Sequence, residues 1–259
     1  MQFKTSFLAL AVLLTSSATA RLEGHERRTA NSIDARSDSN WLKTPEGEGS
    51  SNGFGERTSS GTANAVSFIS YAGNVGKPYG SNIIQISEND APQYKNVLQL
   101  TGENQEPWTV QFWNKAGPDG KLDGFFGHSA VTFDLAPGET KYVAVDADSR
   151  GGFGAAKGGV PKSESGEFAS TWGEFDFSSN QNGGWSGYDV SIIQAQSAGK
   201  DIQGMKICEA PGDKSCSSVS NGGANVQNAY TQSQASQGGV GGNIPGGPVR
   251  LAVTIGYQG

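Results

Sequence analysis

Apolar and polar residues alternate in short segments along most of the chain. Clear examples are Trp108/Val110/Phe112, Val131/Phe133/Leu135 and Leu251/Val253/Ile255. A period of two places alternate side chains on opposite faces of a sheet, so the pattern predicts β-strands. The predicted strands are Val66–Ser70, Asn82–Ser87, Asn96–Thr101, Trp108–Asn114, Ala130–Leu135, Lys141–Asp146, Thr171–Phe177, Tyr188–Gln194, Ile202–Cys208 and Arg250–Tyr257.

Turn-forming residues separate these segments, as in Gly117-Pro118-Asp119-Gly120 and Asn182-Gly183-Gly184. Helical periodicity is nearly absent; one short helix is expected around Asn225–Gln232, and Gly238–Gly247 is expected to be a loop. Many short strands joined by turns predict an all-β fold, an antiparallel β-sandwich.

The first sixty residues differ from the rest. Met1–Ala20 has the pattern of a secretory signal, with Lys4 before an apolar run and small residues at its end. Residues 21–60 are polar and predict a disordered leader, or a pro-piece cut after Arg27-Arg28. We therefore expect a β-sandwich over residues 61–259, secreted, extracellular and free of the membrane once the signal is removed.

Charge limits the choice of partners. The net charge is −6, and residues 1–28 carry four basic and two acidic side chains, which leaves −8 for the remainder. Because phosphate binding needs clustered lysine and arginine, this acidic body argues against nucleic acid as a partner. We expect a monomer.

The two cysteines, Cys208 and Cys216, predict one disulfide in a secreted protein. The short loop that it closes is worth about 2–3 kcal/mol in the chain-entropy description.

Metal and cofactor chemistry find little support. There are two histidines, His25 and His128, and His25 lies in the leader; the sequence thus has no cluster of His and Cys residues of the kind that binds zinc. The segment Asp146-x-Asp148 resembles the start of a calcium loop, but Arg150 occupies a ligand position. We expect no metal and no cofactor.

The acidic segment Glu174-Phe175-Asp176-Phe177 is the first candidate site. Glu174 and Asp176 would share one face of a strand, about 6–7 Å apart, within reach of glycoside chemistry. Catalysis by this pair, ligand binding and a plain solvated face all remain open.

Aromatic residues form a second candidate site. Trp185 and Tyr188 flank a turn beside Asp189, and Trp113 lies opposite the apolar face of its strand. Flat rings beside carboxylates suit sugars, whereas packing within the fold is the alternative for each ring. The candidate glycan-binding residues are Glu174, Asp189, Trp185, Tyr188 and Trp113.

Longer strings carry a family resemblance. The chain from about Gly53 to Tyr257 resembles the fungal Asp f 4-like secreted allergen family in the segments Gly73–Ile84, Pro107–Val110, Gly138–Ala144, Trp172–Phe177, Gly184–Ser191 and Gln203–Cys208. The resemblance implies secretion and recognition by host IgE; it implies no known reaction.

A weaker resemblance is to thaumatin-like proteins, carried by Thr171–Phe177 and Tyr188–Ile193. It implies a β-sandwich with an acidic cleft for β-1,3-glucan, in which Glu174 and Asp189 match cleft acids. Gln194 stands where a further acid belongs. The resulting hypothesis is a non-catalytic allergen associated with cell-wall polysaccharide; the alternative is a weak acidic β-1,3-glucanase that uses Glu174 with Asp176 or Asp189.

Overall fold

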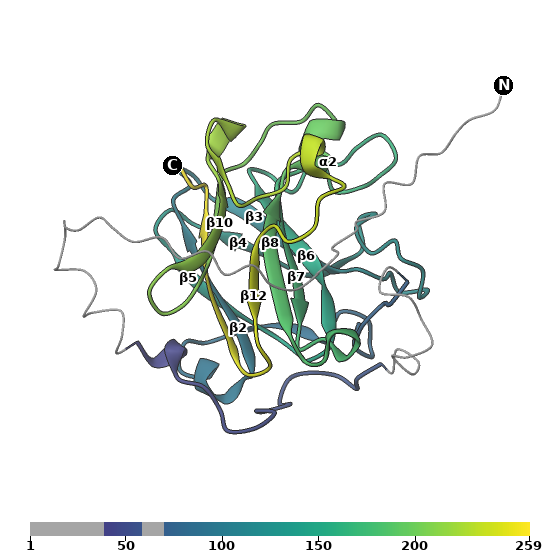
Figure 1. Cartoon of the computed structure of the whole chain (residues 1–259), viewed down its shortest axis with the longest axis vertical. Coiled ribbons are helices and arrows are strands. Elements are labelled where there is room, and N and C mark those ends of the chain that lie inside the picture. Colours follow the sequence, from purple (N-terminus) through teal and green to yellow (C-terminus); the bar gives the residue numbers. More distant parts are fainter. Residues whose placement is uncertain (1–38, 59–69) are drawn as a thin grey trace.

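Two β-sheets lie face to face in the computed structural model, which describes residues 39–58 and 70–259 (Figure 1). The seven-stranded sheet has the order β1 (Ile83–Ile86), β5 (Thr140–Val145), β2 (Asn96–Gly102), β13 (Val249–Ile255), β9 (Met205–Glu209), β10 (Lys214–Val219) and β11 (Val226–Gln227). The six-stranded sheet has the order β12 (Gly242–Ile244), β8 (Ser186–Ser191), β7 (Trp172–Phe177), β6 (Ser149–Ala156), β3 (Trp108–Asn114) and β4 (Ser129–Leu135). The signal segment 1–20, leader residues 21–38 and residues 66–69 of the first predicted strand lie outside the described residues.

The alternating positions build the core between the sheets. Val110 and Phe112 of β3 meet Leu251 and Val253 of β13 there, all of them buried. Removal of this apolar surface from water is the main stabilising contribution to such a fold. The expected all-β class is therefore confirmed.

Several features differ from the predicted elements. β10 was not predicted, and β12 lies inside Gly238–Gly247, which was expected to be a loop. β13 runs parallel to β2, because a strand reached through a long connection need not run antiparallel to its neighbour. The Gly-rich β6 was not predicted, although it lies centrally between β3 and β7. The helix expected at Asn225–Gln232 is absent from the described chain; β11 lies there, and α2 (Ile193–Ser197) follows β8 instead.

Short 3₁₀ helices complete the described chain: η1 (Asn40–Leu42), η3 (Ala91–Gln93), η4 (Asn180–Asn182), η5 (Asn221–Gly223) and η6 (Gln232–Gln234). Within the described ranges, none of the helices has the length and apolar character needed to cross a membrane.

Residues 39–58, assigned above to the leader, pack against the seven-stranded sheet. Trp41 is buried in a second apolar cluster with Tyr94 and Tyr142. The buried Arg250 donates hydrogen bonds to the backbone oxygens of Trp41 (2.7 Å) and Lys43 (2.5 Å). Few apolar residues are needed for this docking, which explains why composition alone did not indicate it.

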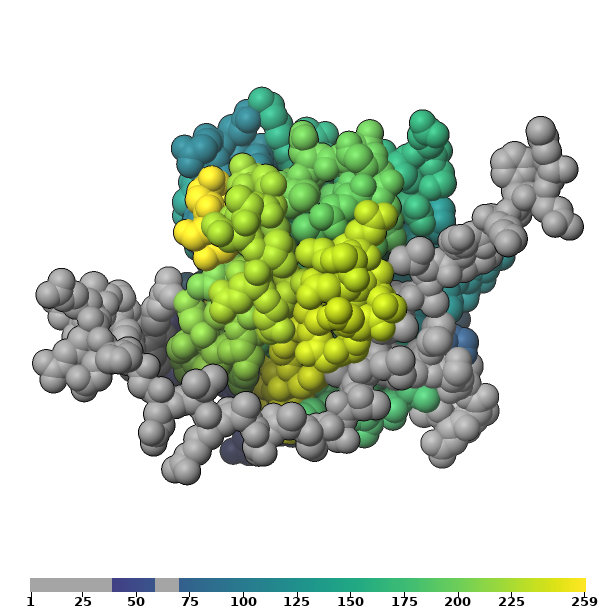
Figure 2. Space-filling view, turned by 45° about the horizontal axis from the view of Figure 1, so that its top comes forward, coloured from purple at the N-terminus to yellow at the C-terminus, as the bar shows by residue number. Residues whose placement is uncertain are grey.

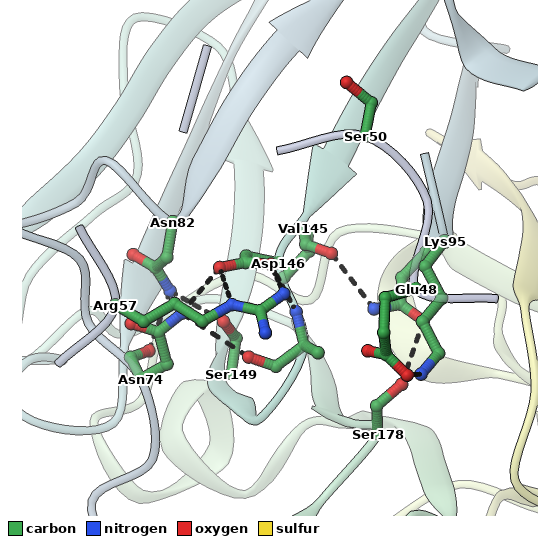
Figure 3. Close-up of polar contacts among 12 residues, drawn as sticks. Glu48, Ser50, Arg57, Asn74, Asn82, Lys95, Val145, Asp146, Ser149 and Ser178 are labelled. Atoms are coloured by element: carbon green, nitrogen blue, oxygen red, sulfur yellow. Dashed lines mark hydrogen bonds and ion pairs between the residues drawn. The ribbon is translucent and has the colours of Figure 1, made fainter. Parts of the chain in front are cut away.

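A buried polar network ties this segment to both sheets (Figure 3). Arg57 holds Asp146 through two hydrogen bonds of 2.7 and 2.5 Å, and Asn74 donates to the same carboxylate at 3.0 Å. Asn82 donates to Ser149 at 2.9 Å, which links the segment before β1 to β6. The network satisfies buried polar groups that would otherwise be costly to remove from water, namely those of Asn74, Asn82, Asp146 and Ser149.

Candidate functional site

Glu174 on β7 and Asp189 on β8 are directly opposed in the antiparallel register. Phe175 follows Glu174 and Tyr188 precedes Asp189, and both of these rings face the core. Because successive side chains in a strand point to opposite faces, the two acids project from the other side of the six-stranded sheet. The structure thus brings together the two candidate acids that the sequence placed on different strands.

The two carboxyl groups are buried and lie within hydrogen-bond reach of each other. Glu174 is 7% exposed and Asp189 is 5% exposed. Burial raises the pKa of Glu174 to about 7, and burial together with the neighbouring Glu174 raises the pKa of Asp189 well above its usual range. No donor among the described residues bonds Glu174 Oε2 or Asp189 Oδ1. The pair therefore holds at least one shared proton up to neutral pH.

The chain itself covers this pair. A Cβ placed on Gly241 would lie only 2.6 Å from Asp189 Cβ, so the backbone of Gly241 rests directly against that residue. On the neighbouring strand β6, Gly152 is paired with Glu174. The ring of Trp113 fills the space that a side chain at position 152 would take. The chain between β10 and β13, yellow-green in Figure 2, forms much of the face seen in that view.

Asp176, the other acid proposed for catalysis, has a different partner. Arg150 of β6 donates to Asp176 at 2.7 Å and also approaches Ser179 at 3.3 Å. Burial raises the pKa of Asp176, and the guanidinium opposes that effect. Arg150 thus places a cation beside Asp176 from the unpredicted strand β6.

The three candidate rings have different surroundings. Tyr188 is 3% exposed and belongs to the core between the sheets. Trp113 is on the face opposite that core, as expected, but is 2% exposed because Phe168 and Trp172 pack against it. Trp185 stands 44% exposed on the turn between β7 and β8. A bound sugar could therefore stack on Trp185 but not on the other two rings.

The expectations about metal ligands and about the disulfide can be compared with the structure. Within the described residues no group of three or more His, Cys, Asp or Glu side chains could hold a metal ion. Cys208 of β9 and Cys216 of β10 form the expected disulfide.

Together these features define a two-sheet β-sandwich whose acidic outer face is covered by its own chain. The chain belongs to the family of Allergen Asp f 4-like domains, whose sequence profile matches residues 81–255. It is 52% identical over 220 residues to Allergen Asp f 4 of Aspergillus fumigatus, covering 84% of this chain and 67% of that protein.

Among solved structures, the chain is similar to the protein elicitor MoHrip2 from Magnaporthe oryzae. The TM-score is 0.38 and the identity 15%, over 62% of this chain and 99% of that one.

Proposed function

We propose that this protein is a secreted, monomeric allergen that binds host IgE and associates with β-glucan of the fungal cell wall without hydrolysing it. The allergen part rests on the family and on the name of the Aspergillus relative. Secretion rests on the signal pattern of residues 1–20.

The observation that carries glycan binding is the exposure of Trp185. It is the most exposed large apolar side chain of the described residues. Its turn also carries Asn180 and Asn182, whose amides both donate and accept hydrogen bonds. An indole face beside amide groups suits a sugar ring, which presents C–H groups on its faces and hydroxyls at its edge.

The carboxyl pair argues against hydrolysis. Retaining glycosidases hold their two carboxyl groups about 5–5.5 Å apart, and inverting ones hold them about 6.5–9.5 Å apart. Glu174 and Asp189 instead contact each other, away from solvent. Asp176 is engaged by Arg150. Neither arrangement leaves two free carboxyl groups on either side of a glycosidic bond.

Retention on insoluble β-1,3-glucan tests the binding. We expect the wild-type protein to be retained and Trp185→Ala to be retained about tenfold less, since an aromatic contact is worth about 1 kcal/mol or more. Phe126→Ala, which removes another exposed ring, is the matched control and should behave as the wild type. Absence of wild-type retention would refute the glucan part of the proposal.

A weak acidic β-1,3-glucanase is the second candidate, and one observation favours it. A carboxyl group with a pKa of about 7, as at Glu174, is suited to general acid catalysis. Release of reducing ends from laminarin at acidic pH separates the two functions. We expect none from the wild type; release that disappears in Glu174→Gln would establish the enzyme instead.

Serum IgE from patients sensitised to Aspergillus fumigatus tests the allergen part. We expect binding to the purified domain that is inhibited by the 52% identical relative, because shared surface residues present shared epitopes. IgE binding that the relative fails to inhibit would contradict shared recognition.

A further inference from the structure

A groove of about 670 Å³ lies at the end of the sandwich away from Trp185. It is formed where β3 begins, where β6 ends and where the chain passes from α2 to β9. The β7–β8 turn is at the other end of β8 from α2, so the groove and Trp185 occupy opposite ends of the molecule (Figure 1).

The apolar part of the groove is one aromatic wall. Trp108 is half-buried, with its inner side against the core, and Ile202 and Pro161 lie nearby in the lining. The indole Nε1 has no hydrogen-bond partner among the described residues and is not enclosed. An apolar ring with a free donor at its edge is thus presented to solvent.

The polar part of the groove has unused donors and acceptors. The side chains of Lys200, Asp201 and Asn221 line it, are exposed, and make no hydrogen bond or ion pair with the described chain. Because no partner orients them, they are available to a ligand at no cost in broken protein contacts.

Charge in the groove is balanced. Lys200 lies next to Asp201 in sequence, and Lys157 pairs with Glu106 at 2.8 Å. A balanced set does not select an anion or a cation, and the small apolar area does not suit a lipid. A ligand with one apolar face and several hydroxyl groups, each both donor and acceptor, matches this lining.

We propose that the Trp108 groove is a second carbohydrate site, separate from the Trp185 turn. This inference rests on the proposed association with β-glucan and places a binding surface at each end of the sandwich. One monomer then joins two glucan strands, and the two contacts reinforce each other on an insoluble wall.

Indole N–H signals of ¹⁵N-labelled protein test this inference with a β-1,3-linked glucose hexasaccharide as the probe. Trp108→Phe and Trp185→Phe assign the two signals. We expect both signals to shift, with separate binding curves. The double variant Lys200→Ala/Asp201→Ala should weaken the Trp108 curve about tenfold and leave the Trp185 curve unchanged.

Lys43→Ala/Glu46→Ala is the matched control, because it also removes one exposed positive and one exposed negative side chain. It should leave both curves unchanged. A Trp185 shift without any Trp108 shift overturns the second site alone, whereas the absence of both shifts refutes the glucan proposal with it. The double variant changes only exposed side chains, so folding is preserved even if Trp108 variants are unstable.

Discussion

Glu174 and Asp189 face each other across β7 and β8, with their carboxyl groups in mutual contact and shielded from water. Burial raises the pKa of both acids, and Glu174 raises that of Asp189 further, whereas the hydrogen bond with Asp189 opposes the rise at Glu174. No lysine or arginine is among the groups that shift the pKa of either acid. The pair is therefore held by protons rather than by a counter-charge.

This pair predicts that the domain is more stable in acid than at neutral pH. The unfolded chain releases the two protons near pH 4, whereas the folded chain holds that of Glu174 to about pH 7. Between these values the folded state binds more protons, so the free energy of unfolding falls as pH rises. Urea unfolding at several pH values measures this slope.

Glu174→Gln isolates the contribution of the pair. The amide keeps the shape and can donate to Asp189, but it has no proton to release, so the fall in stability above pH 5 should shrink. Glu164→Gln, at an exposed position, is the control and should keep the wild-type slope. An unchanged slope in Glu174→Gln would show that other groups cause the pH dependence.

The disulfide predicts a moderate loss of stability on removal. Cys208 and Cys216 are eight positions apart in the sequence, and their disulfide closes a short loop. The link lowers the entropy of the unfolded chain, which stabilises the folded state by about 2–3 kcal/mol. Cys216→Ser should lower the melting temperature by roughly 5–10 °C without unfolding the domain, because β9 and β10 keep their ladder. Reduced wild type should melt with the variant; melting of either at the oxidised wild-type temperature would contradict this estimate.

Arg250 predicts how the segment 39–58 is held. Its buried guanidinium is satisfied by backbone oxygens, those of Trp41 and Lys43 included, and burial lowers its pKa to about 10. A lysine has three donors and cannot reproduce this fork, so Arg250→Lys should cost about 2–4 kcal/mol. Hydrogen exchange at the Leu42 and Lys43 amides, both bonded within η1, should speed up.

Arg57→Lys is the comparison for this prediction. Arg57 also holds the segment, through Asp146, but its side chain is about half exposed, so a smaller effect is expected. Equal exchange rates in the wild type and Arg250→Lys would show that Trp41 packing alone secures the segment.

The strands were predictable where apolar and polar residues alternate along the strand, so that one face of the sheet is apolar and the other is polar. Val110/Phe112 and Leu251/Val253 have this pattern and lie in the core. β6 lacks it, because Gly151 and Gly152 occur where β3 approaches closely: a Cβ on Gly151 would lie 2.0 Å from Trp113 O. Glycine is required there by packing, and glycine contributes no apolar side chain to an alternating pattern.

The candidate site was predictable only in part. Alternation placed Glu174 and Asp176 on one face of a strand, and the resemblance to thaumatin-like proteins linked Glu174 with Asp189. Neither can tell whether that face is open to water. Phe168 covers Trp113, and Gly241 rests on Asp189, both from irregular segments that carry no periodic signal. Burial of the predicted face therefore depends on long-range contacts that local patterns do not encode.

The cover over the acid pair gives the last prediction. Gly241 has φ +94°, and an added Cβ would lie 2.2 Å from Tyr188 O and 2.6 Å from Asp189 Cβ. Gly241→Ala should therefore displace this segment and admit water to the pair.

Gly239→Ala is the control: its φ of +80° imposes a similar backbone strain, but no atom lies within 4 Å of the added Cβ. Hydration lowers the pKa of a buried carboxyl group, so Gly241→Ala should lose both the infrared band of a protonated carboxyl at pH 6 and much of the pH slope. Gly239→Ala should be less stable at every pH yet keep both features. If both variants keep the band, the segment around Gly241 is not what shields the pair from water.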